Sequence, residues 1–507
     1  MAKRAAEQTG PQKAARTSLN GAPRAKVVED ADTEGNMDLD IEGGMEGRVG
    51  DDYESEEEVA ELGGEEEGES MEGVKEEEDG EEKEGKSGEQ QIYVPGKSRP
   101  LEPGEVLEPD PTTYEMYHKV NMPWPCMSVD ILEDKLGSER RSYPATMYVV
   151  TATQAMRPKD NELLVLKLSS LRKTLEKDED EQDSDGDSDE DDDFSGDPIL
   201  ESEAIALRST TNRIRTNALT AKSDRYYTAT MHENGEVCIF DVGAQMRAFD
   251  TPGFVIPKAA KRPQQVVKAH GNVEGYGMDW SPLERDGMLL TGDVSGRVYL
   301  TRNTGSKWTT DRDEFQASDA SIEDIQWSKS ERTVFSTGGV DGCIRIWDTR
   351  AKKHTPALSI VASKSDVNVI SWSEKIDYLL ASGHDDGVWG VWDLRNFRPN
   401  QQPSPVVSYD FHKKPITAIS FDPLDESIVA VASEDNTVTL WDLAVEADDE
   451  EVRQQQAGND QLRDIPPQML FGHWQRDVKD VCWHRQIPGT LLSTGSDGMN
   501  VWKTISV

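Results

Sequence analysis

Apolar and polar residues alternate in short runs that recur along the second half of the chain. Four of these runs align with one another without gaps, at 335–350, 379–395, 429–443 and 491–504. An apolar run ending in an aromatic residue and a polar turn precedes each of them, at 322–330, 367–375, 416–424 and 478–486. Alternation over four to eight residues indicates β-strands. Trp347 and Trp392 lie 45 residues apart, which is typical of a repeated four-stranded unit.

Asp-Gly pairs at 341–342, 386–387 and 497–498 lie between the paired strands of these runs. Asp-Gly is typical of tight hairpin turns, because such turns need residues with positive φ. Cys343, Ile344, Ile346 and Trp347 make their strand apolar on nearly both faces, as expected for a strand packed between two neighbouring sheets. Together these features are the WD-repeat pattern.

Weaker copies of the same unit precede the four clear ones. They lie at 278–300 and 226–242, and the strands of another are predicted at 143–155 and 161–171. We therefore predict an all-β fold, a seven-bladed WD-repeat β-propeller. The last run ends close to Val507, so its blade lacks an outer strand, and we expect the strand at 126–132 to close the ring.

The segment before that strand is predicted to be a helix. Asp110-Pro111-Thr112 is typical of a helix start, and the prolines at 123 and 125 would end the helix. We expect three regions: a disordered tail over 1–94, basic and then acidic; a linker and N-terminal helix over 95–125; and the propeller over 126–507. Acidic inserts at 176–198 and 444–465 are expected to interrupt the propeller.

Acidic residues outnumber basic ones by 98 to 55, and nearly all of the net charge of −43 lies in three tracts. Residues 29–84 contain 27 acidic and 3 basic residues, 176–193 contain 13 and 1, and 446–451 contain 5 acidic residues. Such tracts attract a basic partner and disfavour direct nucleic-acid binding, although they can also serve solubility alone. The candidate partner-binding carboxylates are Asp185, Asp187, Asp189, Glu190, Asp191, Asp192, Asp193, Asp448, Asp449, Glu450 and Glu451.

Motifs that suggest catalysis have structural or chance explanations. The string at 80–87 matches a phosphate-binding loop, but no apolar strand precedes it and its glutamates would repel a triphosphate. The set His473, Ser493, Asp497 and Trp502 resembles the hydrogen-bonded tetrad inside WD blades. We expect no enzyme, cofactor or metal site. Four widely spaced cysteines indicate a reducing compartment, and no apolar run is long enough to cross a membrane.

Residues 114–132, with the string Met-Pro-Trp-Pro-Cys-Met-Ser, and the acidic insert at 176–198 resemble the glutamate-rich WD-repeat proteins. This resemblance implies a ribosome-assembly factor of the nucleus and nucleolus, with cytoplasmic pick-up of its client. The implied role is dedicated chaperone of the basic large-subunit ribosomal protein L-three, delivered to pre-ribosomal particles. The family is similar in turn to the retinoblastoma-associated histone-binding proteins. By that similarity, Tyr114, Tyr117 and His118 and a loop at 446–468 containing Pro466 and Pro467 would form a client groove.

Two other functions compete with this one. A histone-binding chaperone or chromatin-complex subunit would use the same groove for a different basic partner. A substrate adaptor for a ubiquitin ligase would be consistent with the two WD-x-R strings that end at Arg350 and Arg395, although such arginines often stabilise blade edges. Ser184 and Ser188 are followed by acidic residues and would suit an acid-directed kinase.

Overall fold

The structure is a computed structural model of the 507-residue chain, and it describes residues 107, 109–174, 197–219, 224–305, 307–398, 402–446 and 465–507. It also places the backbone of a short strand, β1 (Arg16–Ser18), antiparallel to β6 (Ile199–Ala206). The described residues belong to one compact unit, formed by Met1–Gly21 and Tyr93–Val507. The predicted tail at 1–94 and the acidic inserts at 176–198 and 444–465 lie largely outside the described ranges.

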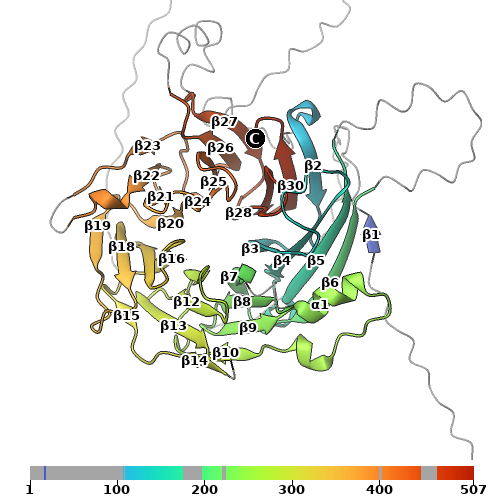
Figure 1. The fold of residues 1–507 in the computed structure, drawn as a ribbon, viewed down its shortest axis with the longest axis horizontal. Coiled ribbons are helices and arrows are strands. Elements are labelled where there is room, and N and C mark those ends of the chain that lie inside the picture. Colours follow the sequence, from blue (N-terminus) through green and yellow to red (C-terminus); the bar gives the residue numbers. More distant parts are fainter. Residues whose placement is uncertain are drawn as a thin grey trace, which may run out of the picture. The chain divides into compact units, whose positions relative to one another are not determined.

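Within those ranges, seven antiparallel sheets are arranged in a ring, as predicted (Figure 1). We call the sheets blades A to G. Blade A contains β3 (Cys126–Leu132), β4 (Ala145–Thr153), β5 (Glu162–Leu171) and β6. Blade B contains β7 (Thr211–Thr216), β8 (Tyr227–His232), β9 (Val237–Asp241) and β10 (Gln265–Val267). Blade C contains β11 (Met278–Trp280), β12 (Met288–Gly292), β13 (Arg297–Asn303), β14 (Trp308–Thr310) and β15 (Phe315–Gln316).

The four clear repeats form the remaining blades. Blade D contains β16 (Ile322–Trp327), β17 (Val334–Gly339), β18 (Cys343–Asp348) and β19 (Leu358–Val361). Blade E contains β20 (Val367–Trp372), β21 (Leu379–His384), β22 (Trp389–Asp393) and β23 (Val407–Tyr409). Blade F contains β24 (Ile416–Phe421), β25 (Ile428–Ser433), β26 (Thr437–Asp442) and β27 (Met469–Trp474). Blade G contains β28 (Asp480–Trp483), β29 (Thr490–Gly495), β30 (Gly498–Thr504) and β2 (Tyr114–Val120).

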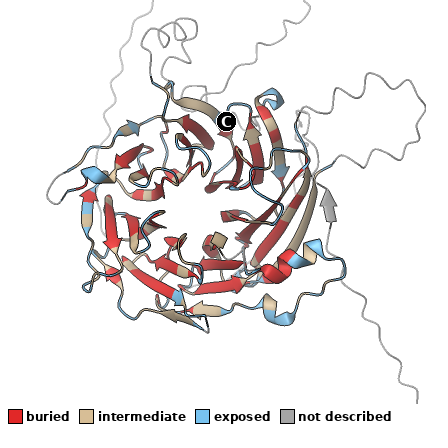
Figure 2. Cartoon of the chain, viewed as in Figure 1, coloured by how far each residue is buried: buried red, intermediate tan, exposed pale blue. Residues whose placement is uncertain are grey.

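Apolar side chains pack between neighbouring blades and form the core. Between blades D and E, for example, Ile344 lies in one cluster with Trp372 and Trp392. The strands are mostly buried and the connections mostly exposed (Figure 2). The innermost strands β3, β7, β11, β16, β20, β24 and β28 pack one against the next, and β28 packs on β3, so the ring is closed. Burial on both faces explains the near-continuous apolar runs in the sequence.

The Asp-Gly turns adopt the predicted conformation. Gly342, Gly387 and Gly498 have φ of 69°, 83° and 113°. A Cβ on Gly342 would lie 2.4 Å from the carbonyl oxygen of Ser363, so this turn requires glycine for space as well as for φ.

The predicted N-terminal helix is wrong. Only Pro111–Thr113 forms a single 3-10 turn, capped by the Asp110 carboxylate, and the chain then continues as the strand β2. Tyr114 and Met116 are both buried, with Glu115 between them less so, as in a strand. Pairing with β30 satisfies the backbone of β2 and covers an edge of the last blade, which a helix could not do.

The predicted closing strand is also wrong. The strand at 126–132 is β3, the innermost strand of blade A, and β2 closes the ring instead as the outermost strand of blade G. Figure 1 shows β2 beside β30, although the two are far apart in sequence. Two strands, β2 and β3, lie between η1 and blade A's second strand, and the first of these two completes the last blade.

Helical structure is confined to the connections of the described part. It consists of α1 (Gly243–Asp250) and short 3-10 turns, among them η2 (Pro158–Asp160), η4 (Lys258–Lys261) and η5 (Leu394–Asn396). None of the described helices is long and apolar enough to span a membrane.

Candidate functional site

The three predicted groove residues on β2 have different environments. Tyr114 is 4% exposed, and its hydroxyl lies 2.8 Å from Nδ1 of His473 on β27. Its ring also packs edge-on against Phe471, with the ring centres 5.2 Å apart. Burial raises the pKa of the Tyr114 hydroxyl and lowers the pKa of His473 to about 3. Tyr114 therefore belongs to the packing between β2 and blade F.

Tyr117 and His118 lie nearer the surface of the same strand. Burial raises the pKa of Tyr117 to about 12, and its ring lies 5.2 Å from that of Tyr114. The Nε2 atom of His118 lies 3.0 Å from the carbonyl oxygen of Arg172, and the amide of Thr174 donates to the carbonyl of Glu115. The chain thus leaves blade A alongside β2 just before the acidic tract at 176–193.

The loop of the predicted groove begins and ends on the outer strands of blade F. Gln468 bridges its two ends, because its backbone carbonyl accepts from the amide of Asp442 and its side-chain amide donates to the carbonyl of Val445. Pro466 is half-buried and accepts from the amide of Met469, whereas Pro467 is exposed. The strand that follows is β27, which packs on β2. The first acidic insert therefore begins beside β2, and the second leads into β27, whose Phe471 and His473 contact Tyr114 of β2.

The predicted partner-binding carboxylates of both tracts lie outside the described residues. They are Asp185, Asp187, Asp189, Glu190, Asp191, Asp192, Asp193, Asp448, Asp449, Glu450 and Glu451.

A second group of carboxylates, which sequence reasoning missed, lies where the innermost strands begin. We call it the carboxylate arc, and its members come from blades B to E: Glu233, Glu274, Glu323, Asp366 and Asp385. Hydrogen bonds place these residues at one end of the sheets. Glu233 donates its amide to the carbonyl of Thr210, directly before β7, and Asp385 donates its amide to the carbonyl of Asp366, directly before β20.

The carboxylate arc is a region of negative charge that Arg213 compensates in part, because burial raises the pKa of Glu323 while the charge of Arg213 lowers it. Burial raises the pKa of Tyr276, and the nearby carboxylates Glu274, Glu323 and Glu233 raise it further. Burial also raises the pKa of Asp366, with a further contribution from Asp385. None of the five carboxylates forms an ion pair with another described residue.

The nearest counter-charge to the arc is already engaged. The Nε of Arg213 donates to the Tyr276 carbonyl at 3.0 Å, and its guanidinium lies 3.8 Å from Asp324. In the described ranges no three His, Cys, Asp or Glu side chains gather as metal ligands do. The arc is therefore suited to the spaced cationic side chains of a polypeptide.

The predicted tetrad of blade G is assembled differently. Trp502 donates to the Ser493 hydroxyl at 3.1 Å, but His473 contacts Tyr114 and Asn500, and Asp497 accepts from Lys119. The serine, histidine and aspartate therefore do not form a hydrogen-bonded chain of the kind that activates a nucleophile. Part of the difference comes from β2, because Tyr114 supplies a hydrogen-bond partner to His473, which lies on β27 of blade F.

Blade F contains the complete tetrad. His412 lies 2.7 Å from Asp435 and 2.9 Å from the Thr439 hydroxyl, which also accepts from Trp441 at 2.7 Å. Asp435, Thr439 and Trp441 belong to blade F, and the buried His412 lies in the connection that leads into its first strand, β24. This histidine network is structural.

The two arginines of the WD-x-R strings pair within their own blades. Arg350 donates to both oxygens of Asp348, and Arg395 does the same to Asp393. The Arg395 guanidinium also lies 3.6 Å from the centre of the Tyr378 ring. Both side chains are exposed and act at the blade edge.

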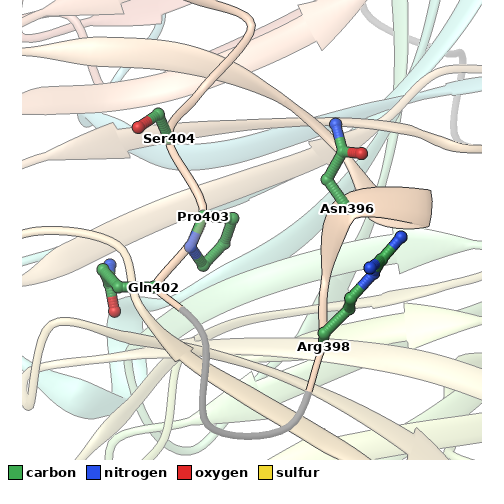
Figure 3. A pocket seen from close by; sticks show the side chains of 5 residues that line it. All are labelled: Asn396, Arg398, Gln402, Pro403 and Ser404. Atoms are coloured by element: carbon green, nitrogen blue, oxygen red, sulfur yellow. The ribbon is translucent and has the colours of Figure 1, made fainter.

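A shallow hollow of about 560 Å³ lies in blade E between η5 and the residues leading to β23 (Figure 3). Asn396 and Arg398 line one side, and Gln402, Pro403 and Ser404 line the other. Among these side chains Arg398 carries the one charge, and no acid–base pair is present. The hollow belongs to the connection between two strands and offers no reactive arrangement.

Comparison with known proteins identifies the family. The chain is 40% identical over its whole length to the whole of the "Ribosome assembly protein rrb1" of Schizosaccharomyces pombe. It is 39% identical to the "Glutamate-rich WD repeat-containing protein 1" of Dictyostelium discoideum, over 94% of this chain and 96% of the relative. The chain belongs to the glutamate-rich WD-repeat family. A further relative, "Protein HEAT STRESS TOLERANT DWD 1" of Arabidopsis thaliana, is 40% identical over 81% of this chain and 90% of the relative.

Two family models match parts of this glutamate-rich WD-repeat protein. One describes the "Histone-binding protein RBBP4" and the corresponding component of the "CAF1 complex", and it matches residues 104–172, which include β2 to β5. The model "WD domain, G-beta repeat" matches residues 310–348 and 403–442. These ranges contain the first three strands of blades D and F and the outer strands β15 and β23 of the preceding blades. The similarity to histone-binding proteins thus falls on the strand that closes the ring and on blade A.

Proposed function

We propose that this protein is a ribosome biogenesis factor and a dedicated chaperone. It binds and shields the newly made, basic large-subunit ribosomal protein L-three and delivers it to large-subunit precursors, without catalysing a reaction. The name of the Schizosaccharomyces pombe relative, which is similar over its full length, supports a role in ribosome assembly. In this proposal the protein acts in the nucleus and nucleolus and first takes up its client in the cytoplasm.

The carboxylate arc carries the proposal. Its members form no ion pairs in the described part of the chain, and burial together with the charge of Asp385 raises the pKa of Asp366. Burial also raises the pKa of Glu323, with a contribution from Asp366 that Arg213 opposes. A lysine or arginine side chain placed among them would relieve this repulsion. A protein that must keep a ribosomal protein from binding RNA too early needs such a surface, because it has to replace the phosphates that the client will contact later.

The acidic tracts extend this attraction over a longer range. Their sequences carry a net charge of −12 at 176–193 and −5 at 446–451. The first insert begins beside β2, and the second leads into β27, which contacts β2. Charges of this density speed the encounter with a basic client, since long-range attraction raises the association rate. In the proposal, these tracts and the side chains Tyr117, His118, Pro466 and Pro467 form a second contact region at the rim. Tyr114 acts there by holding β2 in place.

Histone binding is the second candidate. It is supported by the match of residues 104–172 to the histone-binding model. Histones and ribosomal proteins are both rich in lysine and arginine, so the charge of the arc does not separate them. The lifetimes of the bound proteins separate the two candidates, because histones are long-lived in chromatin, whereas a dedicated chaperone holds only newly made client.

The test is affinity isolation of the tagged full-length protein before and shortly after translation is blocked. A chaperone of new chains loses ribosomal protein L-three quickly after the block. Recovery of histones at an unchanged level, with no ribosomal protein at either time, would overturn the proposal in favour of the second candidate. A matched isolation of a variant with the carboxylate arc neutralised reports whether the recovered protein is bound at that surface.

A further inference from the structure

Blade B contains an insertion between β9 and β10, residues 242–264, that is firmly attached to the propeller. The first turn of α1 is buried, including Ala244, Gln245 and Met246. The Gln245 side chain is completely buried, and its amide donates to the carbonyl of Ala260 at 3.0 Å. This bond fixes η4 against α1. The backbone of η4, from which its side chains extend, therefore has a defined position.

The insertion and the strand after it are basic in an otherwise acidic chain. Residues 251–268 contain Lys258, Lys261, Arg262 and Lys268 and no aspartate or glutamate, whereas the whole chain has 98 acidic residues. Lys268 is neutralised by Glu236 at 2.6 Å. Lys258, Lys261 and Arg262 are exposed and form no ion pair with any other residue that the structure describes. We call these three residues the basic ridge.

A pocket of about 470 Å³ adjoins the ridge, between the outer strands of blades B and C. Gln264 and Gln265, which follow the ridge in sequence, line it together with Asn303 and Trp308. Figure 1 shows the strands β10 and β14, which carry Gln265 and Trp308, next to each other at the outer edge of the ring. Amide side chains beside an aromatic ring are the groups that proteins use to contact an unstacked nucleobase.

The charges at the pocket continue the ridge. Arg225 and Lys307 line it and are exposed, and neither forms an ion pair with a described residue. Asp241 is the one carboxylate in the lining, and it already accepts from Gln264 and from the backbone of Tyr226. Arg225 donates to the Tyr227 hydroxyl at 3.0 Å, which fixes its position.

We propose that the basic ridge and this pocket form a binding surface for single-stranded RNA, with phosphates on the ridge and a base at the pocket. Acidic protein segments would also be attracted to the three cations. RNA is the better match because the pocket adds the aromatic ring of Trp308, on which a base can stack and a run of carboxylates cannot. The inference goes beyond the proposed function and does not depend on the identity of the protein client.

The net charge of −43 does not prevent this contact. At physiological ionic strength charges are screened over about 8 Å, so an RNA strand at the ridge interacts mainly with the side chains beside it. The same screening makes binding dependent on salt, since phosphate contacts release counterions. A basic surface on a chaperone of basic proteins would let it contact the RNA particle while its acidic surfaces hold the client.

The test is fluorescence anisotropy of the full-length protein with a labelled oligouridine of about 20 nucleotides, titrated at several salt concentrations. The ridge variant is Lys258→Glu, Lys261→Glu and Arg262→Glu. The matched control reverses three exposed lysines on and after blade D, Lys352→Glu, Lys353→Glu and Lys364→Glu, and so changes the net charge by the same amount. We expect the ridge variant to bind at least about tenfold more weakly, with the salt slope reduced by about 2 for three lost contacts. The control should bind like the unchanged protein.

Three results would overturn the proposal. The first is that the unchanged protein shows no measurable RNA binding. The second is that the ridge variant and the control lose equal affinity for the RNA. The third is that polyglutamate competes for the protein as strongly as unlabelled RNA does. The last result would assign the ridge to an acidic polypeptide instead. Thermal unfolding of each variant, expected at the unchanged temperature, separates lost binding from lost folding. Retained client binding by the ridge variant separates this surface from the carboxylate arc.

Discussion

Removal of one hydroxyl group, by Tyr114→Phe, tests whether β2 closes the ring of blades. The Tyr114 hydroxyl and the His473 ring are both buried, and their atoms lie 2.8 Å apart between β2 and β27. Burial keeps His473 neutral, with a pKa of about 3. One of its ring nitrogens therefore loses its only strong partner when the hydroxyl is removed. The other nitrogen keeps its contact with Asn500 at 3.1 Å.

The expected cost follows from that unsatisfied group. A buried polar atom left without a partner costs about 1–3 kcal/mol, more than the net value of an ordinary hydrogen bond. The matched control is Tyr117→Phe on the same strand, because no hydrogen bond of the Tyr117 hydroxyl is present in the described part of the chain. The control should change the free energy of unfolding by less than about 0.5 kcal/mol.

The assay is urea unfolding of both variants at about pH 7.5, where His473 is neutral in both states, followed by tryptophan fluorescence. Trp502 is stacked on His473 with the ring centres 4.4 Å apart. It is one of 12 tryptophans, so the signal reports unfolding of the whole ring of blades. Limited proteolysis of the native variants then shows whether β2 is released more often from β30. Equal urea midpoints for Tyr114→Phe and Tyr117→Phe would refute the account of ring closure. They would mean that the Tyr114 hydroxyl contributes no more to stability than a hydroxyl exposed to water.

Three further predictions concern pH and surface charge. Burial raises the pKa of Asp279 to about 6, above its unfolded value, so its contribution to stability is full at low pH and is lost as the pH rises through 6. Asp279→Asn should therefore stabilise the protein by about 1–3 kcal/mol at about pH 7.5 but not at about pH 4. A stability difference between the variant and the unchanged protein that does not depend on pH would contradict this. Burial lowers the pKa of His473 and His484 to about 3, so the contribution of these neutral rings to stability is full above about pH 6.5 and is lost as the pH falls below it. In the Asp279→Asn background, the free energy of unfolding should therefore drop by about 2–3 kcal/mol between about pH 7 and pH 5.5. A constant free energy of unfolding in urea titrations would show that the two rings are hydrated. Arg395→Ala should lower the urea midpoint more than Arg350→Ala, because Arg395 also contacts the Tyr378 ring; the opposite order would show that this contact contributes nothing.

The blades could be predicted from the sequence because their pattern is local. An apolar run, an Asp-Gly turn and a strand that ends in Trp-Asp follow one another within about 15 residues, as at β18 and β22. Each of these features predicts a single local structure, namely a strand, a tight turn and a second strand. The turn glycines 342 and 387 have the positive φ that the pattern predicted. Repetition strengthened the assignment, since every further copy made another fold less consistent with the chain.

The first strand could not be predicted in the same way. Tyr114, Met116, Tyr117 and Val120 fit a helical stripe as well as a bulged strand, and a register shift between Tyr114 and Met116 breaks the strict alternation. The start signal at Asp110 is real, but it begins a single 3-10 turn. The structure of this segment is decided by its pairing with the edge of β30, which is far away in the chain. A pairing between such distant residues cannot be predicted from a short stretch of sequence.

The carboxylate arc could not be predicted for a related reason. Its residues come from successive blades, and each resembles an ordinary surface acid, whereas the dense tracts dominate the charge of the chain. A signal did exist: Glu274 and Asp366 each lie six residues before the tryptophan that ends an innermost strand, Trp280 in β11 and Trp372 in β20. Comparing the repeats position by position, with charge as well as hydrophobicity in view, would have found it.

The most direct test of the proposed function is a binding measurement between the full-length protein and ribosomal protein L-three. The arc variant is Glu274→Gln, Glu323→Gln and Asp366→Asn, and the matched control neutralises the exposed carboxylates Asp313, Glu331 and Glu426 on other parts of blades C, D and F. The account predicts that the arc variant binds at least about tenfold more weakly and with a smaller salt dependence, while the control binds normally. Equal affinities of the arc variant and the control would contradict it.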